Sequence, residues 1–112
     1  MRAAIIQSIS RRWKELIKEG QPLTFRKGQV LVYEGHSPYG IFVVHSGKIK
    51  FSEGNTPCVI EHVWESPDGK VVGLHHFFEQ TPFCCTCTAT QNCQVIFISK
   101  TQLLPFTEET PH

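Results

Sequence analysis

The stretch Ile41–Lys50, IFVVHSGKIK, is an apolar run, a Ser46-Gly47 turn and a second run that alternates apolar and polar residues. This order is typical of a β-hairpin, because glycine readily adopts the positive φ that a tight turn requires. Similar segments, rich in Val, Ile, Phe and Thr, recur about every 8–12 residues on both sides. They are Leu23–Phe25, Val30–Tyr33, Ile41–His45, Lys48–Ser52, Val59–Trp64, Val71–Val72, Cys84–Thr90 and Val95–Ser99.

Turn residues separate these segments. They are Lys27-Gly28, Glu34-Gly35, Ser46-Gly47, Glu53-Gly54-Asn55 and Ser66-Pro67-Asp68-Gly69. Many short strands with glycine-rich turns and no long helix between them predict a mainly β fold, either a sandwich or a barrel.

Helices are expected only at the edges of this pattern and at one point within it. Residues 2–19 carry apolar side chains at three- and four-residue steps, with basic residues between them, and Gly20 and Pro22 follow. Such a helix either binds a membrane surface or a partner, or packs on the domain. We expect packing, since Glu15 and Glu19 dilute the basic face. Leu74–Phe78 and Lys100–Phe106 are read as two further short helices. We therefore divide the chain into a helix (1–19), a β domain (20–106) and a tail (107–112).

Composition excludes several classes of protein. The chain has 112 residues, with 11 Lys and Arg against 10 Asp and Glu, so its formal charge is +1. This balance argues against binding nucleic acid over a whole basic surface, which needs a clustered basic excess. The longest apolar runs, such as Ile41–Val44, fall far short of the ~20 residues of a membrane span.

The cysteines and the N-terminus point to a reducing compartment. The first residues contain no apolar segment typical of a secretory signal. Five cysteines are present, three of them in Cys84-Cys85-Thr86-Cys87, and adjacent cysteines rarely meet disulfide geometry. We therefore predict a cytoplasmic protein with reduced, buried thiols.

The turn residues also carry a resemblance. The first half contains FRKGQVL at residues 25–31, Glu34-Gly35-His36 and the hairpin at Ile41–Lys50. The second half contains SPDGKVVG at residues 66–73 and CCTCTAT at residues 84–90. This succession resembles the cyclic-nucleotide-binding domain family, which includes the sensor halves of bacterial CRP/FNR-type regulators. The resemblance implies an eight-stranded β-roll (jelly-roll-like, a double-stranded β-helix) with an N-terminal helix, a short helix in its ligand cassette and a C-terminal helix.

The cassette departs from that family. Members that bind cyclic AMP or cyclic GMP have a Glu after the cassette glycine and an Arg after the cassette proline. Here Gly73 is followed by Leu74, and Pro82 by Phe83. Because a hydrogen bond to a charged group contributes ~1.5–3 kcal/mol, losing both contacts weakens binding by ~3–6 kcal/mol.

We therefore predict a non-catalytic regulatory or ligand-sensing module that does not bind cyclic AMP or cyclic GMP in the usual way. Its partner would be a small-molecule effector or another protein. The candidate ligand-binding residues are Val72, Gly73, Leu74, His75, Pro82, Phe83, Cys84 and Cys85. The apolar lining of the pocket is expected to comprise Val72, Leu74, Phe77, Phe78 and Phe83.

Two alternatives stay open. The domain could be a divergent cyclic-nucleotide or other effector-binding domain. It could also be a metal, haem or thiol redox sensor, because His and Cys side chains crowd the cassette. The candidate metal ligands are His75, His76, Glu79, Cys85 and Cys87, although their spacing matches no standard zinc site. Nothing in the sequence requires a cofactor.

Other functions are not favoured. The few residues after Phe106 provide no recognition helix, so we expect no direct nucleic-acid binding by these 112 residues. His75-His76-x-x-Glu79 imitates the metal motif of cupins poorly, since adjacent histidines on a strand point to opposite faces. We therefore expect no enzymatic activity. A homodimer is possible through the N-terminal helix, at Trp13 and Ile17.

Overall fold

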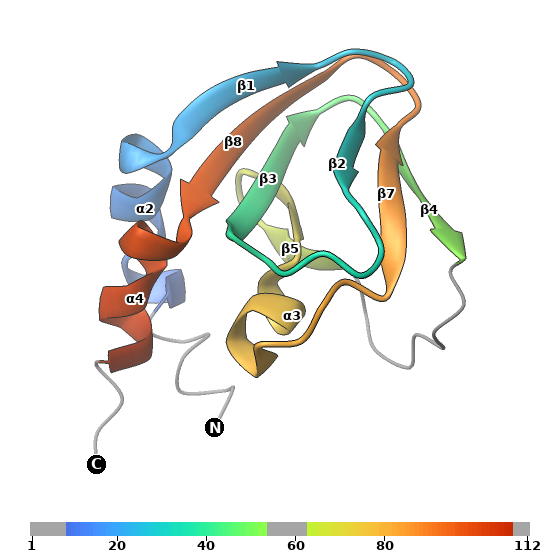
Figure 1. Cartoon of the computed structure of the whole chain (residues 1–112). Coiled ribbons are helices and arrows are strands. Elements are labelled where there is room, and N and C mark those ends of the chain that lie inside the picture. The colour runs from blue at the N-terminus through green and yellow to red at the C-terminus, as the bar shows by residue number, and fades with distance from the viewer. Residues whose placement is uncertain (1–8, 54–62, 109–112) are drawn as a thin grey trace.

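Eight strands form two antiparallel sheets in the computed structural model of the chain, which describes residues 9–53 and 63–108 (Figure 1). The strands are β1 (Gln21–Phe25), β2 (Val30–Val32), β3 (Gly40–Ser46), β4 (Ile49–Glu53), β5 (Val63–Ser66), β6 (Gly69–Val72), β7 (Cys85–Ala89) and β8 (Cys93–Ser99). One sheet has the order β1-β8-β3-β6-β5 and the other the order β2-β7-β4. The predicted mainly β fold with eight strands is therefore confirmed, although part of the predicted segment Val59–Trp64 lies outside the described residues.

The central strands of the five-stranded sheet are buried on both faces, because their successive residues point to opposite sides. Ile41 and Val43 of β3 face the helices, whereas Val44 of the same strand faces the smaller sheet. We call the first group the helix-side core; it consists of Ile9, Trp13, Leu16, Ile41, Val43, Val71, Leu74, Phe77, Ile98 and Leu103. We call the second group the inter-sheet core; it consists of Leu31, Val32, Val44, Val72, Phe83, Cys87, Ala89, Cys93 and Val95.

Three helices supply the other half of the helix-side core. They are α2 (Trp13–Glu19), α3 (Leu74–Glu79) and α4 (Lys100–Glu108). Helices α2 and α4 lie together at one end of β1 and β8 (Figure 1), and the Gln102 side chain donates a 2.5 Å hydrogen bond to the Glu19 carbonyl. A turn at Arg12 separates α2 from the helical residues 9–11. Among the described residues, no helix is both long and apolar enough to cross a bilayer.

Helix α4 begins with a capping box. The Ser99 hydroxyl accepts a 3.3 Å bond from the Gln102 N–H, and the Gln102 side-chain oxygen accepts a 2.9 Å bond from the Ser99 N–H. These reciprocal bonds satisfy backbone donors that a helix start leaves unpaired. They also define where the chain leaves β8, so that Lys100 and Leu104 fall on one side of α4.

A buried indole ties α2 to the β5–β6 turn. The Nε1–H of Trp13 donates a 2.6 Å hydrogen bond to Oδ2 of Asp68, and the Trp13 side chain is only 4% exposed. The ring also packs edge-on against Trp64 with centroids 5.4 Å apart. Asp68 is thus the acceptor for a buried donor 55 residues away in the sequence.

We expect Asp68→Ala to lower the free energy of unfolding by about 1–3 kcal/mol, because the buried Trp13 N–H loses its acceptor. Urea denaturation followed by tryptophan fluorescence measures the change. The exposed residue Lys18 offers a matched control on α2, where Lys18→Ala should stay within about 0.5 kcal/mol of the parent. Equal effects of the two substitutions would contradict a role for the Trp13–Asp68 bond.

Candidate effector-binding site

The cassette is the segment that runs from the end of β6 through α3 to the start of β7. Gly73 opens α3 with φ of +92°, and a Cβ at this position would lie 3.1 Å from Cε1 of Phe83. Both the backbone conformation and the close approach of the Phe83 ring therefore call for glycine here. Gln80 ends α3 with φ of +57°, and the Thr81 N–H donates to the His76 carbonyl over 3.1 Å. Together with the Gln80 N–H, which donates to the Phe77 carbonyl, this is a Schellman end with glutamine in the usual glycine position.

Phe83 occupies the centre of the cassette. Its N–H donates to the His36 carbonyl over 3.1 Å, and its own carbonyl accepts from the Gly35 N–H over 2.9 Å. These two bonds attach the segment before β7 to the loop after β2. The Phe83 side chain is 8% exposed and belongs to the inter-sheet core, with its ring edge-on to His76 at 5.7 Å. The aromatic ring therefore fills the space between the two sheets.

The hollow that remains is too small for an organic ligand. Its volume is about 10 Å³, and its lining is Val32, Phe51, Val72, Gly73, His76, Phe83, Cys84 and Cys85. A space of this size holds about one water molecule. Its lining contains no Lys, Arg, Asp or Glu.

Residues 22–110 match the family model described as the cyclic nucleotide-binding domain. The chain belongs to the cyclic nucleotide-binding domain family. No protein with a curated description matches the chain in sequence.

Solved structures with the same fold include sensor domains of regulators. The chain is similar to DNR from Pseudomonas aeruginosa, with a TM-score of 0.67 and 19% identity over 96% of this chain and 48% of DNR. It is also similar to a proposed cAMP-binding regulatory protein from Silicibacter pomeroyi DSS-3, with a TM-score of 0.66 and 14% identity over 99% of this chain and 55% of that one. A third is the N-terminal domain of a transcriptional regulator from Streptomyces coelicolor A3(2), with a TM-score of 0.61 and 22% identity over 88% and 68% of the two chains.

At these identities the likeness is one of fold. The chain spans about half the length of the first two of these proteins. The fold and the membership of the cyclic nucleotide-binding domain family, expected from the sequence, are thereby confirmed, whereas these likenesses specify no effector for this chain.

The ring of His76 packs edge-on against Phe83, and each of its two nitrogens lies near a polar side-chain atom. Its Nδ1 is 3.0 Å from the Thr81 hydroxyl oxygen, and its Nε2 is 3.5 Å from Sγ of Cys84. Cys84 is disulfide-bonded and carries no thiol proton, so Nε2–H is the donor to sulfur and the Thr81 hydroxyl donates to Nδ1. The imidazole therefore joins the end of α3 to the start of β7.

The disulfide at Cys84 corrects the prediction that all thiols are reduced. Cys85, Cys87 and Cys93 are buried and form no disulfide, as expected, but Cys84 is disulfide-bonded. The prediction rested on the absence of a secretory signal and on the poor geometry of adjacent cysteines, and the second of these restricts pairing inside the cluster only. Cys58 lies outside the described residues.

Five of the eight predicted ligand residues line the hollow, namely Val72, Gly73, Phe83, Cys84 and Cys85. The side chain of Leu74 lies in the helix-side core instead, while His75 is half-buried and Pro82 is exposed. Sequence reasoning missed Val32 and Phe51 as lining residues, and it treated His76 only as a metal candidate. The strand alternation that points Val32 into the inter-sheet core is the signal that could have found it.

The predicted metal ligands are not assembled into a centre. Among residues 9–53 and 63–108, no three His, Cys, Asp or Glu side chains are close enough together to hold a metal ion. Cys87 is fully buried in the inter-sheet core, and Cys85 and His76 line the cassette hollow.

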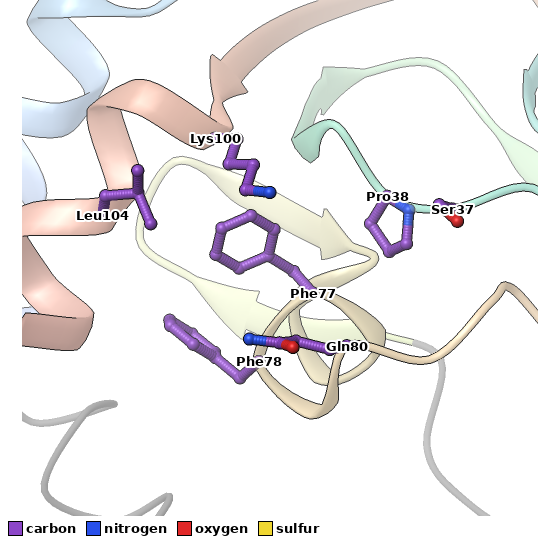
Figure 2. Close-up of a pocket in the computed structure, with 7 residues that line it drawn as sticks. All are labelled: Ser37, Pro38, Phe77, Phe78, Gln80, Lys100 and Leu104. Atoms are coloured by element: carbon purple, nitrogen blue, oxygen red, sulfur yellow. The ribbon is translucent and has the colours of Figure 1, made fainter.

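Phe77 and Phe78, expected in the same pocket as Phe83, line a different space of about 300 Å³. Figure 2 shows this second space between α3, α4 and the loop that precedes β3. The predicted apolar lining is therefore divided: Val72 and Phe83 line the cassette hollow, Phe77 and Phe78 line the second space, and Leu74 lines neither.

Burial makes Cys87 a source of pH dependence. Burial raises the pKa of Cys87 to about 12, with smaller contributions from the neighbouring thiols Cys85 and Cys93. The folded chain therefore keeps this thiol protonated while the unfolded chain ionises it from about pH 9. Its contribution to stability is complete below pH 9 and is lost as the pH rises towards 12.

Between pH 7.5 and pH 10.5 the free energy of unfolding of the parent should fall, because the unfolded chain ionises the Cys87 thiol. In Cys87→Ala this fall should be smaller by about 1–2 kcal/mol. Comparison of the two slopes removes the offset caused by the smaller side chain. Urea titrations at the two pH values measure them. Parallel slopes would show that the Cys87 thiol does not resist ionisation.

Proposed function

We propose that this domain is a non-catalytic regulatory module whose cassette does not take a cyclic nucleotide in the manner of its family. The observation that carries the proposal is the ring of Phe83, which leaves a hollow of about 10 Å³ where an effector would need several hundred. The ring is anchored by backbone bonds to Gly35 and His36 on one side and packs on Gly73 on the other. Emptying the cassette requires that segment to move.

The charges of the cassette support the same conclusion. A cyclic phosphate carries a negative charge, and its burial is costly without a cation or several hydrogen-bond donors. The lining offers His76 as its one titratable nitrogen, and both ring nitrogens of His76 already have partners in Thr81 and Cys84. A less charged effector, or a partner protein that binds the outer surface, suits this module better. A cytoplasmic location remains a prediction from the sequence.

We expect no saturable rise in melting temperature when the parent protein is titrated with cyclic AMP or cyclic GMP to 1 mM. Phe83→Arg should gain such a response, because it removes the ring and supplies the cation that the family uses at this position. A ligand at a hundred times its dissociation constant adds ~2.7 kcal/mol of stability, which is a shift of several degrees for a domain of this size.

Phe83→Ala is the matched control, since it opens the same space without adding charge. If only Phe83→Arg shows a saturable rise in melting temperature, the added guanidinium accounts for the binding. If both variants show it, the removal of the aromatic ring accounts for the binding. A saturable shift in the parent would overturn the proposal and favour the alternative, a divergent cyclic-nucleotide sensor. Leu74 is left unchanged, because a Glu there would place a charge in the helix-side core.

A thiol redox sensor is the second candidate, and the disulfide at Cys84 beside His76 favours it. Reduction would turn the Cys84 sulfur into a thiol, so that the contact with Nε2 of His76 changes at the end of α3. We expect tris(2-carboxyethyl)phosphine to lower the melting temperature of the parent and to shift the ring resonances of His76. The melting temperature should fall because a disulfide commonly contributes 2–4 kcal/mol of stability. Cys84→Ala should show neither response, because it has no disulfide at this position to reduce. A parent indifferent to the reductant would exclude this candidate.

A further inference from the structure

The second space lies where three segments meet. Its lining is Ser37, Pro38, Phe77, Phe78, Gln80, Lys100 and Leu104. Figure 2 shows Phe77 and Phe78 coming from α3, Gln80 from the residue that follows it, Lys100 and Leu104 from α4, and Ser37 and Pro38 from the loop before β3. None of these residues lines the cassette hollow, so this space is a separate site. Its volume of about 300 Å³ is at the lower end of the range for small-molecule pockets.

The lining is apolar on one side and cationic on the other. Phe77, Phe78 and Leu104 provide aromatic and aliphatic surface, and Leu104 is 38% exposed although it is a large apolar residue. The Lys100 side chain reaches over the same space as Phe77 (Figure 2) and forms no ion pair with any described residue. No Asp or Glu belongs to the lining. Ser37 and Gln80 add a hydroxyl and an amide.

We propose that this space binds a small amphipathic carboxylate. Its hydrophobic body would pack on Phe77, Phe78 and Leu104, and its carboxylate would pair with Nζ of Lys100. Pairing satisfies a cation that has no acidic neighbour in the pocket, and burial of the body removes apolar surface from water. A neutral ligand would gain only the second of these, and a cationic ligand would be repelled by Lys100.

The pocket lies between α3 and α4, so that a bound ligand would contact both helices. Phe77 of α3 and Leu103 of α4 both belong to the helix-side core, so the two helices already pack through one cluster. A ligand that contacts Phe78 and Leu104 adds a second connection between them. Binding would therefore hold the cassette helix against the helix that leaves the β-roll, and it does so independently of what the cassette itself binds.

The experiment is a titration of the ¹⁵N-labelled protein with 4-phenylbutyrate, followed by two-dimensional NMR. We expect saturable shifts of the backbone amides of the lining residues, with amides of the cassette strand β7 little changed. 4-Phenyl-1-butanol, which has the same body without the charge, should bind about tenfold more weakly. Lys100→Met should bring the acid and the alcohol to equal affinity. Lys48→Met, at an exposed lysine in the β3–β4 turn, should leave the difference intact.

Leu104→Glu provides a second variant at an exposed position. Its carboxylate lies one helical turn from Lys100 and competes with the ligand for that cation, so the affinity for 4-phenylbutyrate should fall at least tenfold. The proposal is overturned if the acid and the alcohol bind equally to the parent, if Lys100→Met leaves their difference intact, if shifts centre on β7, or if no binding is seen. The cyclic AMP titration tests the cassette, and the 4-phenylbutyrate titration tests the second space. A negative result in one of these experiments therefore leaves the other proposal standing.

Discussion

The contact between the Phe83 ring and Gly73 is the constraint on which the cassette depends. Gly73 has the positive φ that turns the chain from β6 into α3, and the absence of a side chain there lets the ring approach. The same ring is fixed from the other side, because the backbone of Phe83 is bonded to the loop at Gly35 and His36. The loop after β2, the end of β6 and the start of β7 are therefore connected through a single residue, by its side chain on one side and its backbone on the other. A charged residue at this position could not fill the inter-sheet core in the same way.

The five-stranded sheet connects the packing around Phe83 to the packing of the helices. Its central strands place alternate residues in the two cores, so that Val71 packs among the helices while its neighbour Val72 packs beside Phe83. A shift of β6 by one residue would exchange these two environments. Helix α3 follows directly from β6, which means that its position is tied to both cores. The cassette and the helices consequently pack against the two faces of the same strands and are not separate modules.

Much of the framework can be predicted from glycines, because positive φ leaves few substitutes. Gly28, Gly35, Gly47 and Gly69 all have positive φ at predicted turns, and the strands between them follow. The site is less accessible to such reasoning. The direction of Leu74 depends on the rotation of α3 about its axis, and the meeting of Lys100 with Phe77 depends on three segments that are distant in sequence. The bonded state of Cys84 depends on residues outside its own cluster. Local pattern specifies backbone conformation, whereas these contacts arise only from tertiary packing.

Helix α3 contributes lining residues to both spaces. His76 faces the cassette hollow with Phe83, whereas Phe77 and Phe78 face the second space with Lys100. The family's charged ligand contacts are absent from the first side, and on the second side Lys100 forms no ion pair with any residue that the structure describes. The fold has thus kept the glycine framework while the polar chemistry around α3 has a different distribution, as is common where one fold serves several ligands. Since α3 is short and ends at a glutamine in a left-handed conformation, a contact on either side bears on the same six residues.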